Sequence, residues 1–254
     1  MAQKVLFIAV FMALLSCEDS TEVKKTANSI DNSSKPALQK PVEKQEQKIP
    51  QYTIRLTKVD SLEFFRVRNQ VNSKTEKPEK ITDFSKAKKL LKGIVEFEEG
   101  EFSQNVRKIR FRNGKVYNPV HKEDCFFVAY FPKEDILLCE GGHTTDVSFN
   151  LKNGLETEDT GNPDVIISSP SKKKRLNGHF EGQQCFHYFI QERFNGEYVK
   201  IIELTKAFED LTGKWLCTIG PAFWSDDPFF YVSNISYHEE HVKYDYYRIE
   251  TVIK

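Results

Sequence analysis

The stretch from Gly141 to Asp146 holds the densest group of chemically useful side chains in this sequence. It reads Gly-Gly-His-Thr-Thr-Asp, so an imidazole, two hydroxyls and a carboxylate follow two glycines that permit a bend or a close backbone approach. His143, Thr144 and Asp146 are therefore candidate ligand-binding residues, and His143 with Asp146 could supply half of an acid–base pair. We favour the alternative of a polar turn, because acid–base catalysis needs a second partner that the sequence does not identify.

A second polar stretch, Trp224-Ser225-Asp226-Asp227, contains one of the two tryptophans. An exposed Trp224 beside Asp226 could stack on a sugar ring or anchor a partner protein, which makes both residues ligand-binding candidates. The alternative, which we favour, is that Trp224 fills the core at a hairpin turn, as Trp215 would do in Lys-Trp-Leu-Cys.

Metal-binding and cofactor motifs are not recognisable in the sequence. Residues 238–241 read His-Glu-Glu-His, but the zinc motif needs histidines four apart on a helix, and these lie three apart among strand formers. The acidic residues between Glu156 and Asp164 lack the Asp-x-Asp-x-Asp-Gly spacing of a calcium loop. No nucleophile elbow, phosphate-binding loop or dinucleotide fingerprint occurs. We therefore predict no catalytic residue, no metal and no cofactor.

The charges of the chain balance, with 37 basic and 37 acidic side chains. A neutral chain has no broad electrostatic attraction to nucleic acid, so we expect no nucleic-acid partner. The basic cluster Lys172-Lys173-Lys174-Arg175 follows a Ser-Pro turn, and we interpret it as a solvated loop that protects a strand edge.

Four cysteines lie in the body of the chain, at positions 125, 139, 185 and 217. Their neighbours are mostly apolar, which favours buried free thiols. Two disulfides, in any of three pairings, remain the alternative in an exported protein.

The first seventeen residues have the order of a secretory signal. Lys4 precedes the apolar run Val5–Leu15, which is too short to span a bilayer, and Ser16 and Cys17 follow. Leu14-Leu15-Ser16-Cys17 resembles the lipobox of bacterial lipoproteins, which are cleaved before the cysteine and acylated on it. The resemblance implies that residues 1–16 are a signal peptide and that Cys17 carries a diacylglyceryl group and fatty acids such as palmitate.

Residues 17–50 differ in composition from the rest of the chain. They are rich in Lys, Glu, Gln, Ser and Asn and contain no aromatic residue, so they cannot bury enough apolar area to fold. We predict a disordered, lipidated tether, followed by a single mainly β domain over residues 51–254. Glu18 and Asp19 resemble the acidic signals that export some lipoproteins to the cell surface.

The elements of this domain are expected to be mostly strands. One short helix is predicted near 83–92, with a cap at Thr82 or Asp83, an apolar stripe of Ala87, Leu90 and Leu91, and an end at Gly93. Asn113-Gly114, between alternating strand-like segments, is a strong hairpin signal.

Three segments, 125–151, 164–204 and 221–249, share a pattern of strand, tight turn, strand, polar turn and strand. They resemble the repeats of β-propellers, which implies antiparallel hairpins joined in series. A β-meander or sandwich of hairpins gives the same pattern. The fold class predicted is thus mainly β, with antiparallel hairpin repeats in one of these arrangements.

These features together indicate a membrane-anchored lipoprotein of the bacterial cell envelope, acting as a non-enzymatic binding or accessory module. We expect the lipid on Cys17 to bind the membrane and the folded domain to bind a protein or a glycan. The expected location is the outer membrane, on its periplasmic or outer face. Two alternatives remain: an envelope hydrolase with a site near His143 and Asp146, and an inhibitor or immunity lipoprotein.

Overall fold

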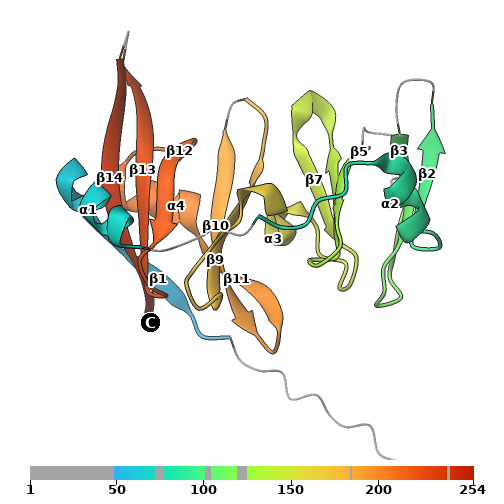
Figure 1. Ribbon diagram of the computed structural model, residues 1–254, viewed down its shortest axis with the longest axis horizontal. Coiled ribbons are helices and arrows are strands. Elements are labelled where there is room, and N and C mark those ends of the chain that lie inside the picture. The colour runs from blue at the N-terminus through green and yellow to red at the C-terminus, as the bar shows by residue number, and fades with distance from the viewer. Residues whose placement is uncertain (1–48, 72–76, 101–103, 119–124, 184, 239–240) are drawn as a thin grey trace, which may run out of the picture. The chain divides into compact units, whose positions relative to one another are not determined.

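The computed structural model describes residues 49–71, 77–100, 104–118, 125–183, 185–238 and 241–254 (Figure 1). These residues belong to one compact unit that reaches Lys254. They form three antiparallel sheets with a few short helices, so the mainly β prediction is confirmed. The predicted signal peptide, the lipidation residue Cys17 and the tether up to residue 48 lie outside the described residues.

The first sheet joins the two ends of the folded unit. Its strands, in spatial order, are β1 (Tyr52–Val59), β14 (His241–Ile253), β13 (Phe229–His238) and β12 (Ile219–Trp224). The β1–β14 ladder runs from the pair Tyr52–Ile253 to the pair Val59–Tyr246. The strand that begins the unit is therefore held by the strand that ends it.

The second sheet is a meander of consecutive strands. Its order is β11 (Glu197–Glu203), β10 (Phe186–Phe194), β9 (Lys174–Phe180) and β8 (Ile167–Ser168). Asn195 and Gly196 connect β10 to β11, and both have positive φ angles, 50° and 88°. This is the geometry of a two-residue hairpin turn, for which Asn-Gly is the preferred sequence.

The third sheet has six strands. Five follow the order β2 (Val95–Glu99), β3 (Gln104–Arg110), β5 (Phe126–Phe131), β6 (Ile136–Glu140) and β7 (Asp146–Asn150), and β4 (Val116–Tyr117) pairs with β3. The predicted turn at Asn113-Gly114 connects β3 to β4, with Gly114 at a φ of 87°.

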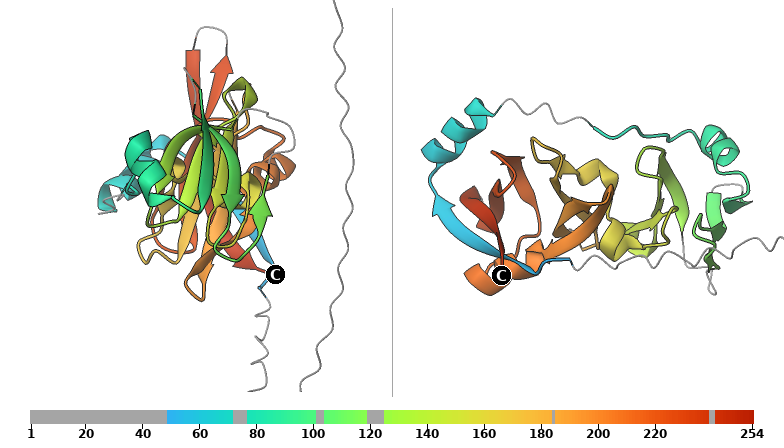
Figure 2. Two further views of the ribbon diagram at one scale, coloured as in Figure 1. Left: turned by 90° about the vertical axis from the view of Figure 1, so that its right-hand side faces the viewer. Right: turned by 90° about the horizontal axis from the view of Figure 1, so that it is seen from below.

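The three predicted repeats correspond to the three sheets. Segment 125–151 supplies β5 to β7, segment 164–204 supplies β8 to β11, and segment 221–249 supplies most of β12 to β14. Within the described part of the chain, each strand pairs only inside its own sheet. Figures 1 and 2 show the β8–β11 sheet between the other two, in agreement with its contacts to both.

Short helices lie between the strands. They are α1 (Ser61–Gln70), α2 (Phe84–Leu90), α3 (Thr157–Thr160) and α4 (Leu204–Thr212), with 3₁₀ turns η1 (Gly142–Thr144) and η2 (Pro163–Val165). Among the described helices, none has the length and apolar character needed to cross a membrane.

Helix α2 is the predicted short helix. The side chain of Asp83 accepts a hydrogen bond from the backbone N–H of Lys86, which is the expected cap. Ala87 and Leu91 are buried, as predicted, but Leu90 is 54% exposed and does not belong to the buried stripe. Helices α1 and α4 were not predicted.

The main hydrophobic core lies between the first and second sheets. It contains Leu176, Ile190 and Ile202 from the second sheet and Trp224, Phe230 and Ile249 from the first, with Phe208 of α4. A second core fills the third sheet beneath α2 and includes Ile109, Leu137 and Phe149. The contact between the second and third sheets is different, because polar side chains fill it.

Two of the four cysteines in the folded unit form a disulfide, and the other two are free thiols. Cys185 and Cys217 form a disulfide that joins the segment before β10 to the segment before β12. Cys125 and Cys139 are free and buried, as the apolar surroundings indicate. The preference for free thiols is therefore wrong for one pair, since the fold brings Cys217 to a neighbour 32 residues earlier.

Candidate ligand-binding pocket

The second sheet has one apolar and one polar face. Because side chains alternate along a strand, Leu176 of β9 faces the core, whereas Arg175 and Asn177 occupy the opposite face. Gln191 and Phe189 of β10 are the register partners of Arg175 and Asn177, and they share that face. Arg175, Asn177 and Gln191 are all buried.

Hydrogen bonds fix the polar side chains of this face. Gln191 Oε1 accepts from Arg175 Nε at 2.6 Å and from Asn177 Nδ2 at 3.3 Å. The amide of Gln191 donates to the carbonyl of Asp159 at 2.7 Å, and Asn177 Nδ2 donates to the carbonyl of Thr160 at 2.7 Å. The network thus connects the second sheet to α3, and it orients Arg175 through Gln191.

The approach of α3 to this network requires glycine at position 161. Gly161 has a φ of 67°, in the left-handed region. A Cβ atom there would lie 2.6 Å from Asn177 Oδ1. Gly161 therefore permits both the turn that ends α3 and its close contact with Asn177.

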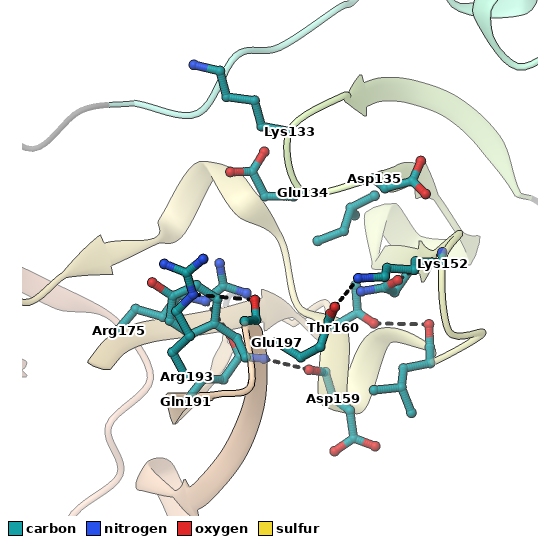
Figure 3. A pocket seen from close by; sticks show the side chains of 15 residues that line it. Lys133, Glu134, Asp135, Lys152, Asp159, Thr160, Arg175, Gln191, Arg193 and Glu197 are labelled. Carbon is teal, nitrogen blue, oxygen red and sulfur yellow. Dashed lines mark hydrogen bonds and ion pairs between the residues drawn. The ribbon is translucent and has the colours of Figure 1, made fainter. Parts of the chain in front are cut away.

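A pocket of about 290 Å³ opens beside this network, between the second and third sheets (Figure 3). This volume is near the lower limit for small-molecule sites. Its lining residues come from the β5–β6 turn, the segment after β7, helix α3, strands β9 and β10, and the β10–β11 hairpin. They are Lys133, Glu134, Asp135, Ile136, Asn150, Lys152, Leu155, Asp159, Thr160, Arg175, Gln191, Arg193, Gly196, Glu197 and Tyr198.

Most acidic groups of the pocket are already paired. Asp135 accepts two hydrogen bonds from Arg112, which lies outside the pocket, from Nε at 2.6 Å and from Nη2 at 3.0 Å. Asp159 forms an ion pair with Lys200, 3.2 Å away. Lys152 and Glu197 neutralise one another across the pocket.

Two arginines remain close together on one wall. The guanidinium of Arg175 stacks on the ring of Tyr198, with its carbon 3.8 Å from the ring centroid, and that of Arg193 lies 6.0 Å from the same centroid. Figure 3 shows the two side chains next to each other. Two neighbouring guanidinium groups repel each other, and an anion between them would relieve that repulsion.

Arg175 is the most unusual charge in the pocket, since it is only 8% exposed. Burial lowers the pKa of its guanidinium to about 10, while Tyr198 and Glu134 partly oppose the shift. The group therefore stays positive at neutral pH and bears a desolvation cost. Glu134 is the nearby acid, and its buried Oε2 has no hydrogen-bond partner among the described residues.

The structure places the predicted residues of the 141–146 stretch at the end of the third sheet. His143 and Thr144 are exposed in η1, with positive φ angles of 57° and 62°. Asp146 Oδ2 accepts hydrogen bonds from the backbone N–H of Phe180, at 2.8 Å, and from Asn162 Nδ2, at 3.0 Å. Asp146 therefore ties the third sheet to the second.

The predicted residues of the second stretch lie in the core and in a turn. Trp224 is 1% exposed and donates from Nε1 to the carbonyl of Ile167, at 2.9 Å. Asp226 accepts a hydrogen bond from the backbone N–H of Phe229, at 3.1 Å, and closes the β12–β13 turn. The core position of Trp224 is confirmed, but that of Trp215 is wrong, since Trp215 is 70% exposed and bonds to Glu209.

The interpretation of the basic cluster as a solvated loop is confirmed for exposed Lys172 and Lys173 and is wrong for the two residues that follow. Lys174 and Arg175 are buried strand residues, because β9 begins inside the cluster and passes between the other two sheets. The alternation of Arg175, Asn177 and His179 with Leu176 was the available signal for a strand with one polar face. In the 238–241 run, His238 ends β13 and His241 begins β14, and Glu239 and Glu240 lie outside the described residues.

Comparison with known proteins does not assign a family or a function to this site. No protein-family model matches the sequence, and neither the curated proteins nor the solved structures give a match.

Proposed function

We propose that this protein is a lipid-anchored binding module of the bacterial cell envelope, and that its folded unit captures a small anionic ligand. The observation that carries the ligand class is buried Arg175 beside Arg193, in a pocket where Asp135, Asp159 and Glu197 already pair with other basic side chains. A carboxylate or a phosphate group has the charge and planar or tetrahedral oxygens that guanidinium groups bind. No catalytic residue is required for this role.

The anchor part of the proposal is supported by the sequence from Leu14 to Cys17 and by the spacer that follows it. Acylation of Cys17 would hold the module at a membrane, with the outer membrane as the expected site. Cells fed a clickable palmitate analogue should label the wild-type protein and not Cys17→Ala. Unlabelled wild-type protein would refute the anchor, and membrane fractionation would separate inner from outer membrane.

The ligand part can be tested by thermal shift and calorimetry on the full chain in detergent. The probes are inorganic phosphate and a panel of small carboxylates and phosphate esters, with amines of matching size as the opposite charge class. We expect anions to raise the melting temperature of the wild-type protein, since a ligand that binds only the folded state stabilises it.

Arg175→Gln should remove this stabilisation, because it deletes the charge that the pocket presents. Arg110→Gln is the matched control, since Arg110 pairs with Glu96 at the surface of the third sheet, away from the pocket. The ligand proposal fails if no anion stabilises the wild-type protein, or if Arg175→Gln responds to anions as the wild type does.

The hydrolase expectation gains no support from the site geometry, because the Asp146 carboxylate is occupied by Phe180 and Asn162. An activity screen of the wild-type protein and His143→Ala on glycan, ester and peptide substrates tests that alternative. A pull-down from envelope extract tests the inhibitor alternative, which requires a stoichiometric protein partner.

A further inference from the structure

A second polar group lies on the same face of the second sheet, beyond Asn177. His179 of β9 and His187 of β10 are register partners, and their rings stack with centroids 5.4 Å apart. Glu181 follows β9 directly, and Glu158 of α3 approaches from the third-sheet side. Glu158, His179 and Glu181 thus place metal-binding atoms within 4.8 Å of one another, and His187 lies beside Glu181.

The distances between these atoms fit a single small cation. His179 Nε2 lies 3.4 Å from Glu181 Oε1 and 3.9 Å from Glu158 Oε1, and His187 Nδ1 lies 3.6 Å from Glu181 Oε1. In a tetrahedral zinc site with bonds of about 2.0–2.1 Å, neighbouring ligand atoms are about 3.4 Å apart. Small shifts would therefore bring Glu158, His179 and Glu181 onto one ion, and a larger movement of His187 would add it as the fourth ligand.

The hydrogen bond of His187 to Glu203 uses one ring nitrogen and leaves the other available to a metal. His187 Nε2 bonds to Glu203 Oε2 at 2.7 Å, and Glu203 also pairs with Lys200. A histidine that gives one ring N–H to a carboxylate keeps the lone pair of its other nitrogen free for a metal. In His187 that other nitrogen is Nδ1, the atom near Glu181.

The charge and burial of the group also favour a cation. Side-chain exposure of His179 is 4%, so the ring is held inside the protein while its Nε2 faces the carboxylates of Glu158 and Glu181. Two carboxylates face the two histidine rings, while Lys200, which also donates to the carbonyl of Glu158, is engaged by Asp159 and Glu203.

We propose that Glu158, His179, Glu181 and His187 form a binding site for one divalent transition-metal ion, with zinc the best match, and that Glu203 orients His187. Two histidine nitrogens with two carboxylates suit zinc better than calcium or magnesium, which need more oxygen ligands. The exposed carboxylates of Glu158 and Glu181 give the ion a route from solvent. This site uses none of the pocket arginines and stands independently of the proposed function.

The test is calorimetric titration of the untagged full chain with zinc, together with cobalt as a spectroscopic probe. We expect one zinc per chain and a visible cobalt absorption typical of tetrahedral coordination. Glu181→Gln should weaken zinc binding at least tenfold, and Glu203→Gln, which changes only the partner of His187, about tenfold. Glu181 is half-exposed, so its substitution should leave the fold intact, which circular dichroism checks.

Two controls make the result specific. His143→Ala removes an exposed histidine of the neighbouring η1 loop and should leave zinc affinity unchanged. Cys125→Ala removes a free thiol and should also have no effect. The proposal is overturned if the wild-type chain binds no stoichiometric zinc, or if Glu181→Gln and His187→Gln bind it as tightly as the wild type.

Discussion

Both faces of the β8–β11 sheet are buried, one by apolar side chains and the other by polar side chains. On the face toward the first sheet, Leu176 and Ile190 pack into an apolar core. On the face toward the third sheet, their neighbours Arg175 and Gln191 are equally buried but meet polar partners. One strand pair therefore supplies both a stability interface and a polar interface.

The contrast shows where function is expected in this fold. An apolar contact contributes most of the free energy of folding and tolerates many packing solutions. A buried polar contact adds little net stability, because desolvation opposes its hydrogen bonds, yet it fixes geometry and leaves charges available. Both the arginine pocket and the proposed metal site lie on the polar face.

The largest effect should come from the apolar face. Ile190→Ala leaves a cavity in the main core and should lower the free energy of unfolding by about 4 kcal/mol, measured by urea denaturation. Ile253→Ala, at an exposed position of β14, should change it by less than about 0.5 kcal/mol. A loss below about 1 kcal/mol for Ile190→Ala would contradict the assignment of this face as the stability interface.

The disulfide should have the next largest effect. The bridge from Cys185 to Cys217 closes a loop of 32 residues that joins the second sheet to the entry of the first. Its loss in the double variant Cys185→Ala/Cys217→Ala should cost about 3 kcal/mol in unfolding free energy, through the entropy of the unfolded chain. Wild-type protein should become less stable in reductant, whereas the double variant should be insensitive to it; equal stability of the two proteins in oxidising buffer would refute the prediction.

The polar face should show a smaller stability effect and a separate effect on binding. Gln191→Ala leaves Arg175 Nε and the carbonyl of Asp159 without their partner, which should cost about 2 kcal/mol in unfolding free energy. It should also weaken anion binding, because Gln191 orients Arg175. Stability comes from denaturation and affinity from calorimetry; anion affinity equal to that of wild type would show that the network does not position Arg175.

A charged residue outside both faces gives the smallest effect and a pH signature. Hydrogen bonds from Lys214 and Lys58 lower the pKa of Asp245 to about 2, with Nζ–Oδ distances of 2.6 and 2.8 Å. Because the folded-state pKa is depressed, this stabilisation is present above about pH 4 and is lost as the pH falls toward 2.

We expect Asp245→Asn to lose about 1 kcal/mol of unfolding free energy at pH 7, a value reduced because both lysines are largely exposed. The loss should vanish near pH 2, and anion binding at the pocket should be unchanged. A constant difference between the two proteins from pH 7 to pH 2 would contradict the role of the carboxylate charge.

Local signals predicted the strands, turns and one helix well. Asn113-Gly114 and the Asp83 cap act within a few residues, so the sequence displays them directly. Helix α1 was not predicted, because Phe64 is its one buried side chain. Leu62 and Phe65 of the same helix are exposed, so the sequence shows no apolar stripe at helical spacing. Helix α4 was not predicted, because it follows β11 without an intervening turn residue that would mark where the strand ends.

The polar site could not be predicted, because its partners come from distant segments. Arg175 depends on Tyr198 and Gln191, and His179 depends on Glu158, none of which is adjacent in sequence. The run of lysines before Arg175 has the composition of a solvated loop, and only the packing of the three sheets shows that Lys174 and Arg175 are buried. Side-chain chemistry was visible in the sequence, whereas burial was not.

The pairing of β1 with β14 has a consequence for how the protein matures. Tyr52 cannot pair with Ile253 until nearly all of the unit has been synthesised. Pairing between segments so far apart in sequence is slow, so the backbone N–H and C=O groups of β1 stay without strand partners until late in folding. We therefore expect residues 52–59 to gain protection from hydrogen exchange later in folding than the local hairpins do.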